Sequence, residues 1–258
     1  MRIAVLLKEV PDTYSDREMN LETGLTDRSG DVVADEVGER AVEAALRIAE
    51  AAGDDTVVEI LSVGPESAAD SVRRGIAMGA ADAYLVSDAA LAGADVTLTA
   101  EVLAKLVEKQ GYDLVIAGAE SSDGGSGVIA PMIGELLGWP ALTNLTEVAV
   151  ADGRVTATQA SDGATVELAA ALPAVVSVAD EFTDPRYPNF KGLMAAKKKE
   201  LHAVTLADLG VDAEDFTRPR AIVVAIERRP ERERGEILDA NSTSSARLVD
   251  FLESKNLI

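Results

Sequence analysis

Short apolar runs alternate with longer stretches of helical spacing over the first half of this chain. The apolar runs have the length and continuity of strands that are buried on both faces. They lie at Arg2 to Leu7, Thr56 to Val63, Ala83 to Val86 and Asp113 to Ala117. The helical stretches lie at Gly38 to Ala52, Ser67 to Met78, Asp95 to Lys109 and Gly127 to Leu137. Because strand, helix and strand join by right-handed crossovers, the alternation predicts an α/β fold with an open parallel sheet and helices on both faces.

The termini of these helices carry recognisable signals. Ser67 and Asp95 stand where the second and third helices begin, as capping residues do. Gly53, Gly79 and Gly111 follow three of the helices, where a glycine commonly ends a helix. The boundaries of the predicted elements therefore rest on local chemistry as well as on periodicity.

The pattern changes after Trp139-Pro140. Two alternating runs, Leu145 to Ala151 and Arg154 to Gln159, flank Asp152-Gly153, a two-residue hairpin signal. Asp162-Gly163 starts a further turn before Thr165 to Leu168. We therefore expect a small antiparallel element over residues 143–170, followed by a buried strand over residues 174–178.

The last part of the chain differs in composition. We expect a nucleotide-binding type of α/β domain over residues 1–183 and a separate C-terminal part over residues 184–258, rich in proline, charge and turn formers. That part holds one apolar run, Ala221 to Ile226, and a last helix, Ser244 to Lys255. It has no core of its own, so it should lie on a partner or on the main domain, or else be loose.

Few residues here can perform covalent or metal chemistry. The 258 residues include no cysteine and one histidine, His202, so we predict no catalytic residue and no metal ligand. The apolar run after Met1-Arg2 is too short for a signal-peptide core or a membrane span. We therefore expect a cytoplasmic protein.

The formal net charge is −21, from 45 acidic and 24 basic residues spread along the sequence. A nucleic-acid partner needs a basic surface, so this charge argues against one. The acidic composition resembles that of proteins from salt-loving archaea, in which strong salt screens charge repulsion. The other interpretation is an acidic docking surface for a basic partner, but the acidic residues are not concentrated in one segment of the chain.

The residues after the fourth apolar run form a glycine-rich loop that leads into a helix. Gly124, Gly125 and Gly127 permit backbone angles that other residues avoid, so successive amides can turn toward one anion at a helix start. Asp123 and Ser126 can hydrogen-bond locally or cap the helix. The loop either seats a phosphate group or simply joins strand to helix.

Four stretches together resemble the β subunit of electron transfer flavoprotein, in order and spacing over nearly the whole chain. Lys8 to Thr13 is similar to the family's V-K-x-V-P-D-T opening, and Ser87 to Asp95 to its S-D-R-A-F-x-G-A-D segment. Ser121 to Pro131 resembles the A-I-D-G-D-T-G-Q-V-G-P loop. Asp184 to Pro188, with Gly192 to Lys199, resembles E-P-R-Y-P and its G-I-M-K-A-K-K-K continuation.

The resemblance implies an αβ heterodimer that carries electrons from acyl-CoA or other flavin dehydrogenases to a membrane quinone oxidoreductase or a similar acceptor. FAD is then shared with the α subunit near the interface. The β subunit holds AMP or a second FAD in a Rossmann-like nucleotide site whose glycine loop takes the phosphates. This grouping agrees with the rule that ligands of open parallel sheets sit at the carboxyl ends of strands.

Carried over residue by residue, the implied cofactor-binding set lies at these strand ends and in the loop. It comprises Leu6, Lys8, Asp12, Asp35, Val37, Gly38, Val63, Gly64, Asp123, Gly124, Gly125, Ser126, Gly127 and Val128.

The resemblance also places a partner-recognition loop between Tyr187 and Lys199, with Phe190 as the exposed apolar anchor. The alternative is that Phe190 packs on its own domain, as most phenylalanines do. Lys197 to Lys199 is the only basic run, and it either balances a helix dipole or steers acidic partners. The implied partner-binding residues are Tyr187, Phe190, Leu193, Met194, Lys197, Lys198 and Lys199.

Three departures from the family pattern bear on the nucleotide site. The family's N-P-F/Y-D before the first helix is Asp35 to Gly38 here, so an aromatic is missing, and the usual loop glutamine is Val128. The loss of that amide should shift phosphate contacts onto the backbone. Asp35 and Glu36 would repel a phosphate, so either these carboxylates point outward or the site binds nucleotide weakly except at high salt. Asp12 is either near a flavin or an ordinary turn former.

Two functional alternatives stay open from the sequence. A stand-alone adenine-nucleotide sensor of the universal-stress type shares a late phosphate loop, but would need neither the hairpin nor the C-terminal part. Within the electron-carrier interpretation, the choice between AMP and a second FAD is open, with a slight preference for AMP in an aerobic halophile.

Overall fold

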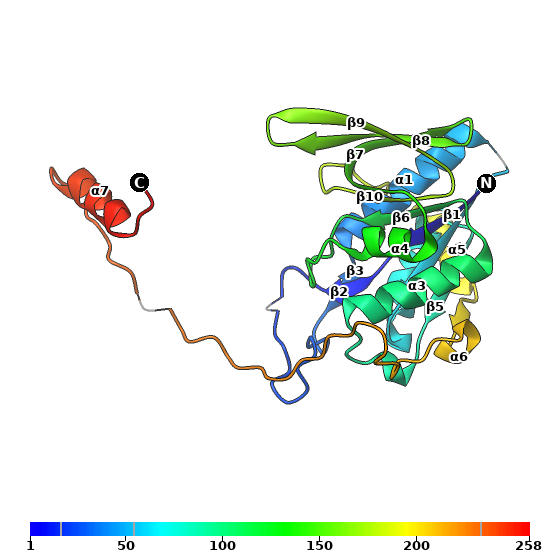
Figure 1. Ribbon diagram of the computed structural model, residues 1–258, viewed down its shortest axis with the longest axis horizontal. Coiled ribbons are helices and arrows are strands. Elements are labelled where there is room, and N and C mark those ends of the chain that lie inside the picture. Colours follow the sequence, from blue (N-terminus) through cyan, green and yellow to red (C-terminus); the bar gives the residue numbers. More distant parts are fainter. Residues whose placement is uncertain (16, 54, 233) are drawn as a thin grey trace. The chain divides into compact units, whose positions relative to one another are not determined.

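A mostly parallel sheet forms the centre of the molecule in the computed structural model, which describes residues 1–15, 17–53, 55–232 and 234–258. Among these residues nine strands pair in the order β11-β5-β4-β1-β6-β10-β7-β8-β9 (Figure 1). The strands are β1 (Arg2–Leu6), β4 (Val57–Val63), β5 (Asp82–Val86), β6 (Leu114–Gly118), β7 (Ala141–Ala151), β8 (Arg154–Ser161), β9 (Ala164–Ala171), β10 (Ala174–Val178) and β11 (His202–Val204). The predicted α/β class is confirmed.

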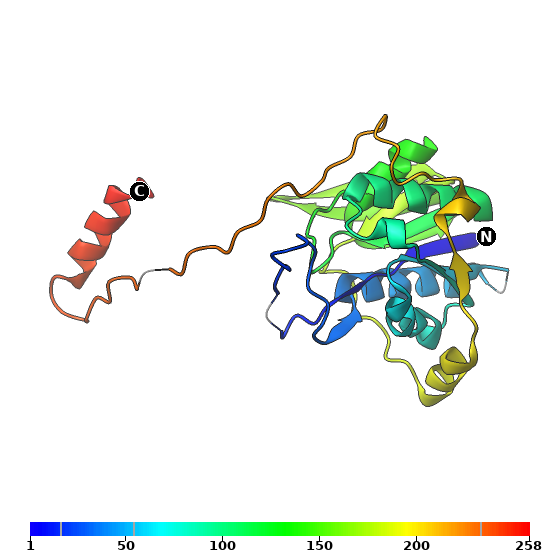
Figure 2. The same ribbon diagram turned by 90° about the horizontal axis from the view of Figure 1, so that it is seen from below.

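Helices cover both faces of this sheet, and Figure 2 shows the two layers on opposite sides of it. Alternate residues of β1 explain the two layers, because Ile3 and Val5 face one apolar cluster and Ala4 faces the other. One layer holds α1 (Glu36–Ala52), α2 (Ala69–Met78) and α5 (Phe190–Lys198), and the other holds α3 (Val96–Gln110), α4 (Ile129–Leu137) and α6 (Leu206–Leu209).

The capping signals were mostly correct. The Asp95 carboxylate accepts the amide of Leu98 at 2.8 Å and begins α3. Gly53, Gly79 and Gly111 end their helices with positive φ. Ser67 is the exception: it lies inside the 3-10 turn η1 (Glu66–Ala68), and α2 begins after Ala68 without a side-chain cap. A second 3-10 turn, η2 (Ala89–Leu91), precedes α3.

The antiparallel hairpin is present and continues the main sheet. Asp152 and Gly153 both have positive φ, +50° and +71°, as a tight turn between twisted strands requires. β7 pairs antiparallel with β8 and parallel with β10. The hairpin is therefore an extension of the sheet edge, where the sequence suggested only a local element.

The C-terminal part divides between two compact units, Met1–Ala225 and Ile226–Ile258. In the first unit, β11 adds to the main sheet beside β5, although no strand was predicted there. The apolar run over residues 221–226 has no regular secondary structure. The second unit contains α7 (Ser244–Ser254). None of the helices among the described residues is both long and apolar enough to cross a bilayer.

Candidate functional site

The carboxyl ends of three neighbouring strands meet at one edge of the sheet. β1 lies between β4 and β6, and all three run parallel. The helices that follow β1 and β4 cover one face of the sheet, whereas the helix that follows β6 covers the other. The crevice of an open α/β sheet forms where successive connections diverge in this way. Leu6, Val63 and the glycine-rich loop are therefore brought to one edge, as expected.

The glycine-rich loop between β6 and α4 adopts left-handed backbone angles in its second half. Gly125 and Gly127 have φ of +57° and +65°, a region that favours glycine, whereas Gly124 is outside it. The requirement for glycine is therefore confirmed at two of the three predicted positions. A Cβ atom at Gly125 would meet nothing within 4 Å, so its constraint is the backbone angle alone.

The loop uses its first amides internally and leaves the later ones open. The amide of Ser122 donates to the Asp35 carboxylate, and the amide of Gly124 donates to the Asp123 carboxylate. The amide of Gly125 donates to the Ser121 carbonyl. Within the described part of the chain, the amides of Ser126, Gly127 and Val128 donate to no protein group. α4 begins after Val128 without a side-chain cap. Open amides at the positive end of a helix form a binding site for an anion.

Asp35 points inward, contrary to one of the two expectations for the acidic pair. It is only 3% exposed, and its two carboxylate oxygens accept the amides of Gly38 at 3.0 Å and Ser122 at 2.9 Å. The carboxylate thus caps α1 and ties the glycine loop to that helix. Glu36 is exposed to solvent. The Asp35 carboxylate therefore has a structural role, because two backbone amides and the positive end of the α1 dipole stabilise its charge.

Gly118 holds the end of β6 against the first turn of α1. A Cβ atom there would lie 3.0 Å from the Val37 carbonyl carbon and 3.2 Å from the Gly38 amide nitrogen. This glycine, which directly follows the predicted strand, was not singled out from the sequence. No spacing pattern could have found the contact, because it joins segments some eighty residues apart.

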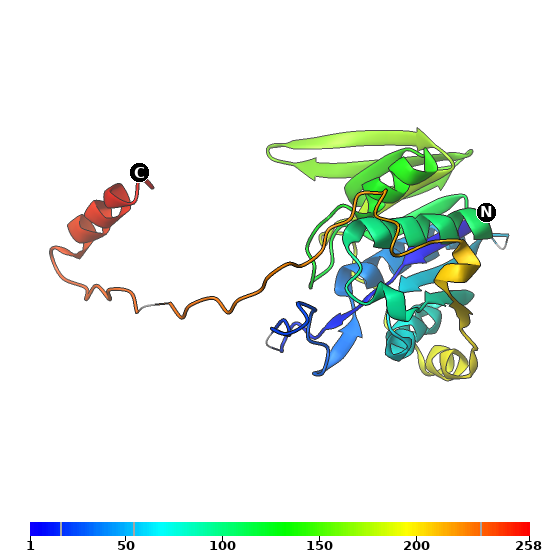
Figure 3. The ribbon, with the colours of Figure 1, turned by 60° about the horizontal axis from the view of Figure 1, so that its bottom comes forward.

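Basic side chains surround the first half of the loop. Lys8 Nζ lies 2.6 Å from one oxygen of Asp123, and Arg28 Nη2 lies 3.1 Å from the other. Arg17 donates to the Ser122 carbonyl. Figure 3 shows the blue segment that carries Arg17 and Arg28 at the same end of the sheet as the green loop. Lys8 was predicted to belong to the site, whereas Arg17 and Arg28 were missed.

The carboxylate of Asp123 is charged in this setting. Its side chain is 6% exposed, and burial alone would raise its pKa. The hydrogen bonds and charge of Lys8, together with Ser121 and the Gly124 amide, outweigh burial and hold the pKa of Asp123 below its ordinary value. The ion pairs therefore persist at neutral pH.

Asp12 is not drawn into this cluster. Its carboxylate accepts the amide of Tyr14 at 2.9 Å, and its own amide donates to the Asp31 carbonyl. The residue forms a local turn between β2 (Glu9–Pro11) and β3 (Val32–Ala34), an antiparallel ribbon outside the main sheet. Gly64, by contrast, directly follows β4 and donates to the Val86 carbonyl at 3.1 Å.

The expected partner-binding residues gather on and around α5. Asn189 caps this helix, and Phe190 and Tyr187 are 79% and 87% exposed. Phe190 and Met194 line an open apolar groove with the alkyl chains of neighbouring lysines. Leu193 is 41% exposed. Phe190 does not pack into its own domain, so the alternative to an exposed anchor is wrong.

The basic run of this segment divides into two parts. Lys197 and Lys198 are exposed in the last turn of α5. Lys199 instead pairs with Asp82 at 3.0 Å, and the same carboxylate lies 3.2 Å from His202 Nε2. Lys199 thus helps to fasten the end of the segment to β5.

Arg186 fastens the start of the segment to α1. Its Nε lies 2.8 Å from the carboxylate of Glu43, which is 4% exposed, and its Nη1 lies 2.5 Å from Glu50. Arg47 Nε lies 2.7 Å from the same Glu43. Burial alone would raise the pKa of Glu43, but hydrogen bonds from Arg186 and Arg47 lower it below its ordinary value. Tyr187 stacks over the guanidinium of Arg74 at 5.2 Å.

The ion pairs of Glu43 with Arg186 and Arg47 should contribute to folding stability at neutral pH and lose that contribution in acid. Because the folded pKa of Glu43 is lowered, its contribution is complete above the ordinary pKa of 4.5 and is lost as pH falls through the folded value. Glu43→Gln should lower the free energy of unfolding by roughly 1–3 kcal/mol at pH 7. The difference in unfolding free energy between Glu43→Gln and wild type should narrow below pH about 4.5. Urea titrations at several pH values would measure this difference.

Glu50→Gln is the matched control for this measurement. Glu50 bonds the same arginine, but its side chain is 61% exposed. Its removal should cost only about 0–1 kcal/mol. A gap between Glu43→Gln and wild type that stays constant from pH 7 down to the acid transition would contradict the assignment.

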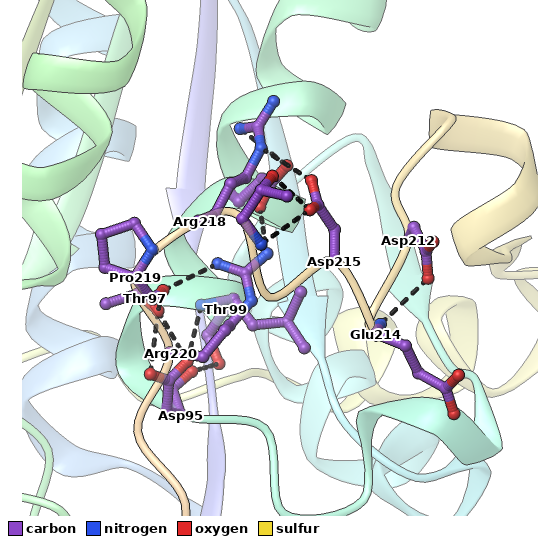
Figure 4. A network of polar contacts seen from close by, with 12 residues as sticks. Asp95, Thr97, Thr99, Asp212, Glu214, Asp215, Arg218, Pro219 and Arg220 are labelled. Atoms are coloured by element: carbon purple, nitrogen blue, oxygen red, sulfur yellow. Dashed lines mark hydrogen bonds and ion pairs between the residues drawn. The ribbon is translucent and has the colours of Figure 1, made fainter.

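A cluster of arginines and carboxylates holds the end of the first unit on α3 (Figure 4). Arg218 and Arg220 pair with Glu101 at 2.9 and 2.6 Å, and the Arg220 side chain is 7% exposed. The amide of Ala221 donates to Asp95 at 2.6 Å. The chain is therefore fastened as far as Ala221, and the three residues that follow are exposed.

Comparisons with known proteins identify the family of this chain. The electron transfer flavoprotein domain family matches residues 23–209. The electron transfer flavoprotein subunit beta of Mycobacterium bovis is 39% identical over 263 residues, which cover 99% of each chain. The subunit of the same name from Thermoanaerobacterium thermosaccharolyticum is 33% identical, and the match covers 100% of each chain. The one from Bacillus subtilis is 31% identical, and the match covers 99% of this chain and 98% of the relative.

Proposed function

The chain belongs to the electron transfer flavoprotein β-subunit family, and from that premise we propose that it is the β half of an αβ heterodimer that carries electrons. Electrons come from acyl-CoA or other flavin dehydrogenases and pass to a membrane quinone oxidoreductase or a similar acceptor. FAD is shared with the α subunit, and AMP or a second FAD occupies the β subunit. The full-length match to β subunits favours this carrier over a stand-alone nucleotide sensor.

The observation that carries the proposal is the set of open backbone amides at the strand switch point. The open amides of Ser126, Gly127 and Val128 stand at the start of α4, with Lys8 beside the same loop. Amides at a helix start, next to a cation, suit a phosphate group. Leu6, Val63 and the other strand-end residues would then hold the rest of the nucleotide.

When bound, the flavin supplies the redox chemistry, and the side chains of the β subunit hold and orient it. No residue of the site is a cysteine or histidine nucleophile or base. The protein therefore acts by binding and positioning, which agrees with relatives that are electron carriers. We place the protein in the cytoplasm of a salt-adapted cell, where its charge of −21 is screened.

Two surfaces are assigned to partners in this proposal. The exposed face of α5, with Phe190 at its start, docks on dehydrogenases. The C-terminal arm packs on the α subunit, since α7 has no buried residue and leaves the apolar side chains of Val249 and Phe251 45% and 53% exposed. Burial of such side chains against a partner is the usual source of affinity.

The test is coexpression of the chain with its α subunit, followed by an absorbance spectrum and nucleotide extraction in molar KCl. We expect a yellow heterodimer with one flavin and one AMP, or two flavins. A colourless chain that retains neither an adenine nucleotide nor a second subunit would refute the proposal.

Phe190→Ala should slow electron transfer from dehydrogenases without loss of assembly. An exposed aromatic that fills a partner pocket contributes roughly 2 kcal/mol or more, or about 30-fold in dissociation constant. The αβ dimer and its flavin content should be unchanged. Stopped-flow reduction at varied dehydrogenase concentration would measure the effect.

Phe216→Ala is the control for this variant. Phe216 is 69% exposed but follows α6, a helix that packs on the face of the sheet opposite to α5. It should leave the transfer rate at the wild-type value. Equal rates for Phe190→Ala and wild type would remove the anchor role.

A further inference from the structure

Arg28 occupies an unusual position for a basic residue of such an acidic chain. It lies between β2 and β3, and its side chain crosses to the glycine loop, 95 residues further along the sequence. Its Nη1 donates to the Glu9 carbonyl at 2.9 Å, and its Nη2 reaches Asp123. The carbonyl carries no charge, so Asp123 is the only anion to which Arg28 is paired among the described residues.

Asp123 serves two cations at once. One carboxylate oxygen takes Lys8 at 2.6 Å and the Gly124 amide at 2.6 Å, and the other takes Arg28 at 3.1 Å. One negative charge thus faces two positive ones. The cations stay 43% and 31% exposed, while the carboxylate between them is almost buried.

The nearby carboxylates do not neutralise the second cation. Asp35 gives its two oxygens to the amides of Gly38 and Ser122. The Glu9 carboxylate accepts the hydroxyl of Ser71 at 2.9 Å. Each is engaged by a neutral donor of its own, whereas Arg28 and Lys8 share a single carboxylate.

The donors of Arg28 are also only partly used. A guanidinium carries several N–H groups in a fixed plane, and a carbonyl and one carboxylate oxygen engage only two of them here. The remaining donors are on a side chain that Asp123 and Glu9 already hold in place. A cation held in position before its ligand arrives binds an anion with less loss of conformational freedom.

We propose that Arg28 is a phosphate-binding residue of the β-subunit nucleotide site and that Asp123 positions it there together with Lys8. The inference rests on the proposed function, because it assumes an adenosine phosphate at the open amides of α4. It adds a side-chain cation to a site for which the sequence had indicated mainly backbone contacts. The ligand chemistry is the phosphate of AMP or the diphosphate of FAD.

The experiment uses the αβ heterodimer, from which nucleotide is stripped and to which AMP and, separately, FAD are titrated in increasing KCl. Arg28→Met keeps the length of the side chain but removes its charge, and should weaken binding about tenfold at low salt. The difference should shrink as KCl rises, because salt screens the attraction. Arg28→Lys should recover most of the affinity. The titration that shows the charge-dependent difference, AMP or FAD, identifies the ligand.

Arg154→Met is the matched control, since Arg154 is exposed at the start of β8, on the hairpin. It should bind nucleotide as the wild type does. Melting of each stripped dimer separates folding from binding: Arg28→Met should melt close to wild type. Equal affinity and salt dependence for Arg28→Met and wild type, or no recovery in Arg28→Lys, would overturn the role of Arg28. Failure of the wild type to bind either nucleotide would instead refute the proposed function.

Discussion

Gly192→Val should displace α5 and both destabilise the protein and slow its reaction with dehydrogenases. A Cβ atom at Gly192 would lie 2.3 Å from the carbonyl oxygen of Ala77, at the end of α2. The obstructing atom belongs to the backbone, so no side-chain rotation can relieve the contact. The helix must move as a whole, and overpacking of this kind costs about 1–3 kcal/mol.

Thermal melting and stopped-flow reduction together measure this effect. Gly30→Ala is the control, since a Cβ atom there would meet nothing within 4 Å and its φ is not in the left-handed region. Phe190→Ala should slow transfer with no change in melting, whereas Gly192→Val should change both. A Gly192→Val protein with wild-type melting and transfer rate would show that α5 does not sit on α2 as described.

Gly125→Val should strip the nucleotide from the β subunit. Gly125 has φ of +57°, which a β-branched residue adopts only at a cost of about 1–3 kcal/mol. Relief of that strain would break the turn in which the Gly125 amide donates to the Ser121 carbonyl at 2.9 Å. The open amides that follow would then no longer converge on one anion.

Mass spectrometry of nucleotide released from the denatured heterodimer tests this outcome. Gly163→Val matches the substitution in conformation, with φ of +71° and nothing within 4 Å, but lies in the turn between β8 and β9. It should retain nucleotide at the wild-type level. Full retention in Gly125→Val would show that the loop is only a connector.

Local chemistry determined most of the secondary structure. The apolar runs became β1, β4, β5 and β6, and the helices between them begin and end within about two residues of the expected positions. The hairpin turn at Asp152-Gly153 and the glycine positions 125 and 127 were also correct. These features could be predicted because each depends on the conformational preferences of a few adjacent residues.

Contacts between residues far apart in the sequence decided the features that local pattern could not predict. β11 has three residues and becomes a strand only because β5 offers it an open edge. Arg28 meets Asp123, and Arg186 meets Glu43, across 95 and 143 residues respectively. The inward direction of Asp35 likewise follows from the approach of the glycine loop to α1.

The sequence by itself therefore determined the α/β class, the glycine-rich loop between β6 and α4, and the family. Only the tertiary structure decided which loop amides are open, which cations lie beside them and how α5 is fastened to the sheet. The physical reason is that local pattern specifies the elements, whereas side chains far apart in the chain acquire partners only when those elements are packed together.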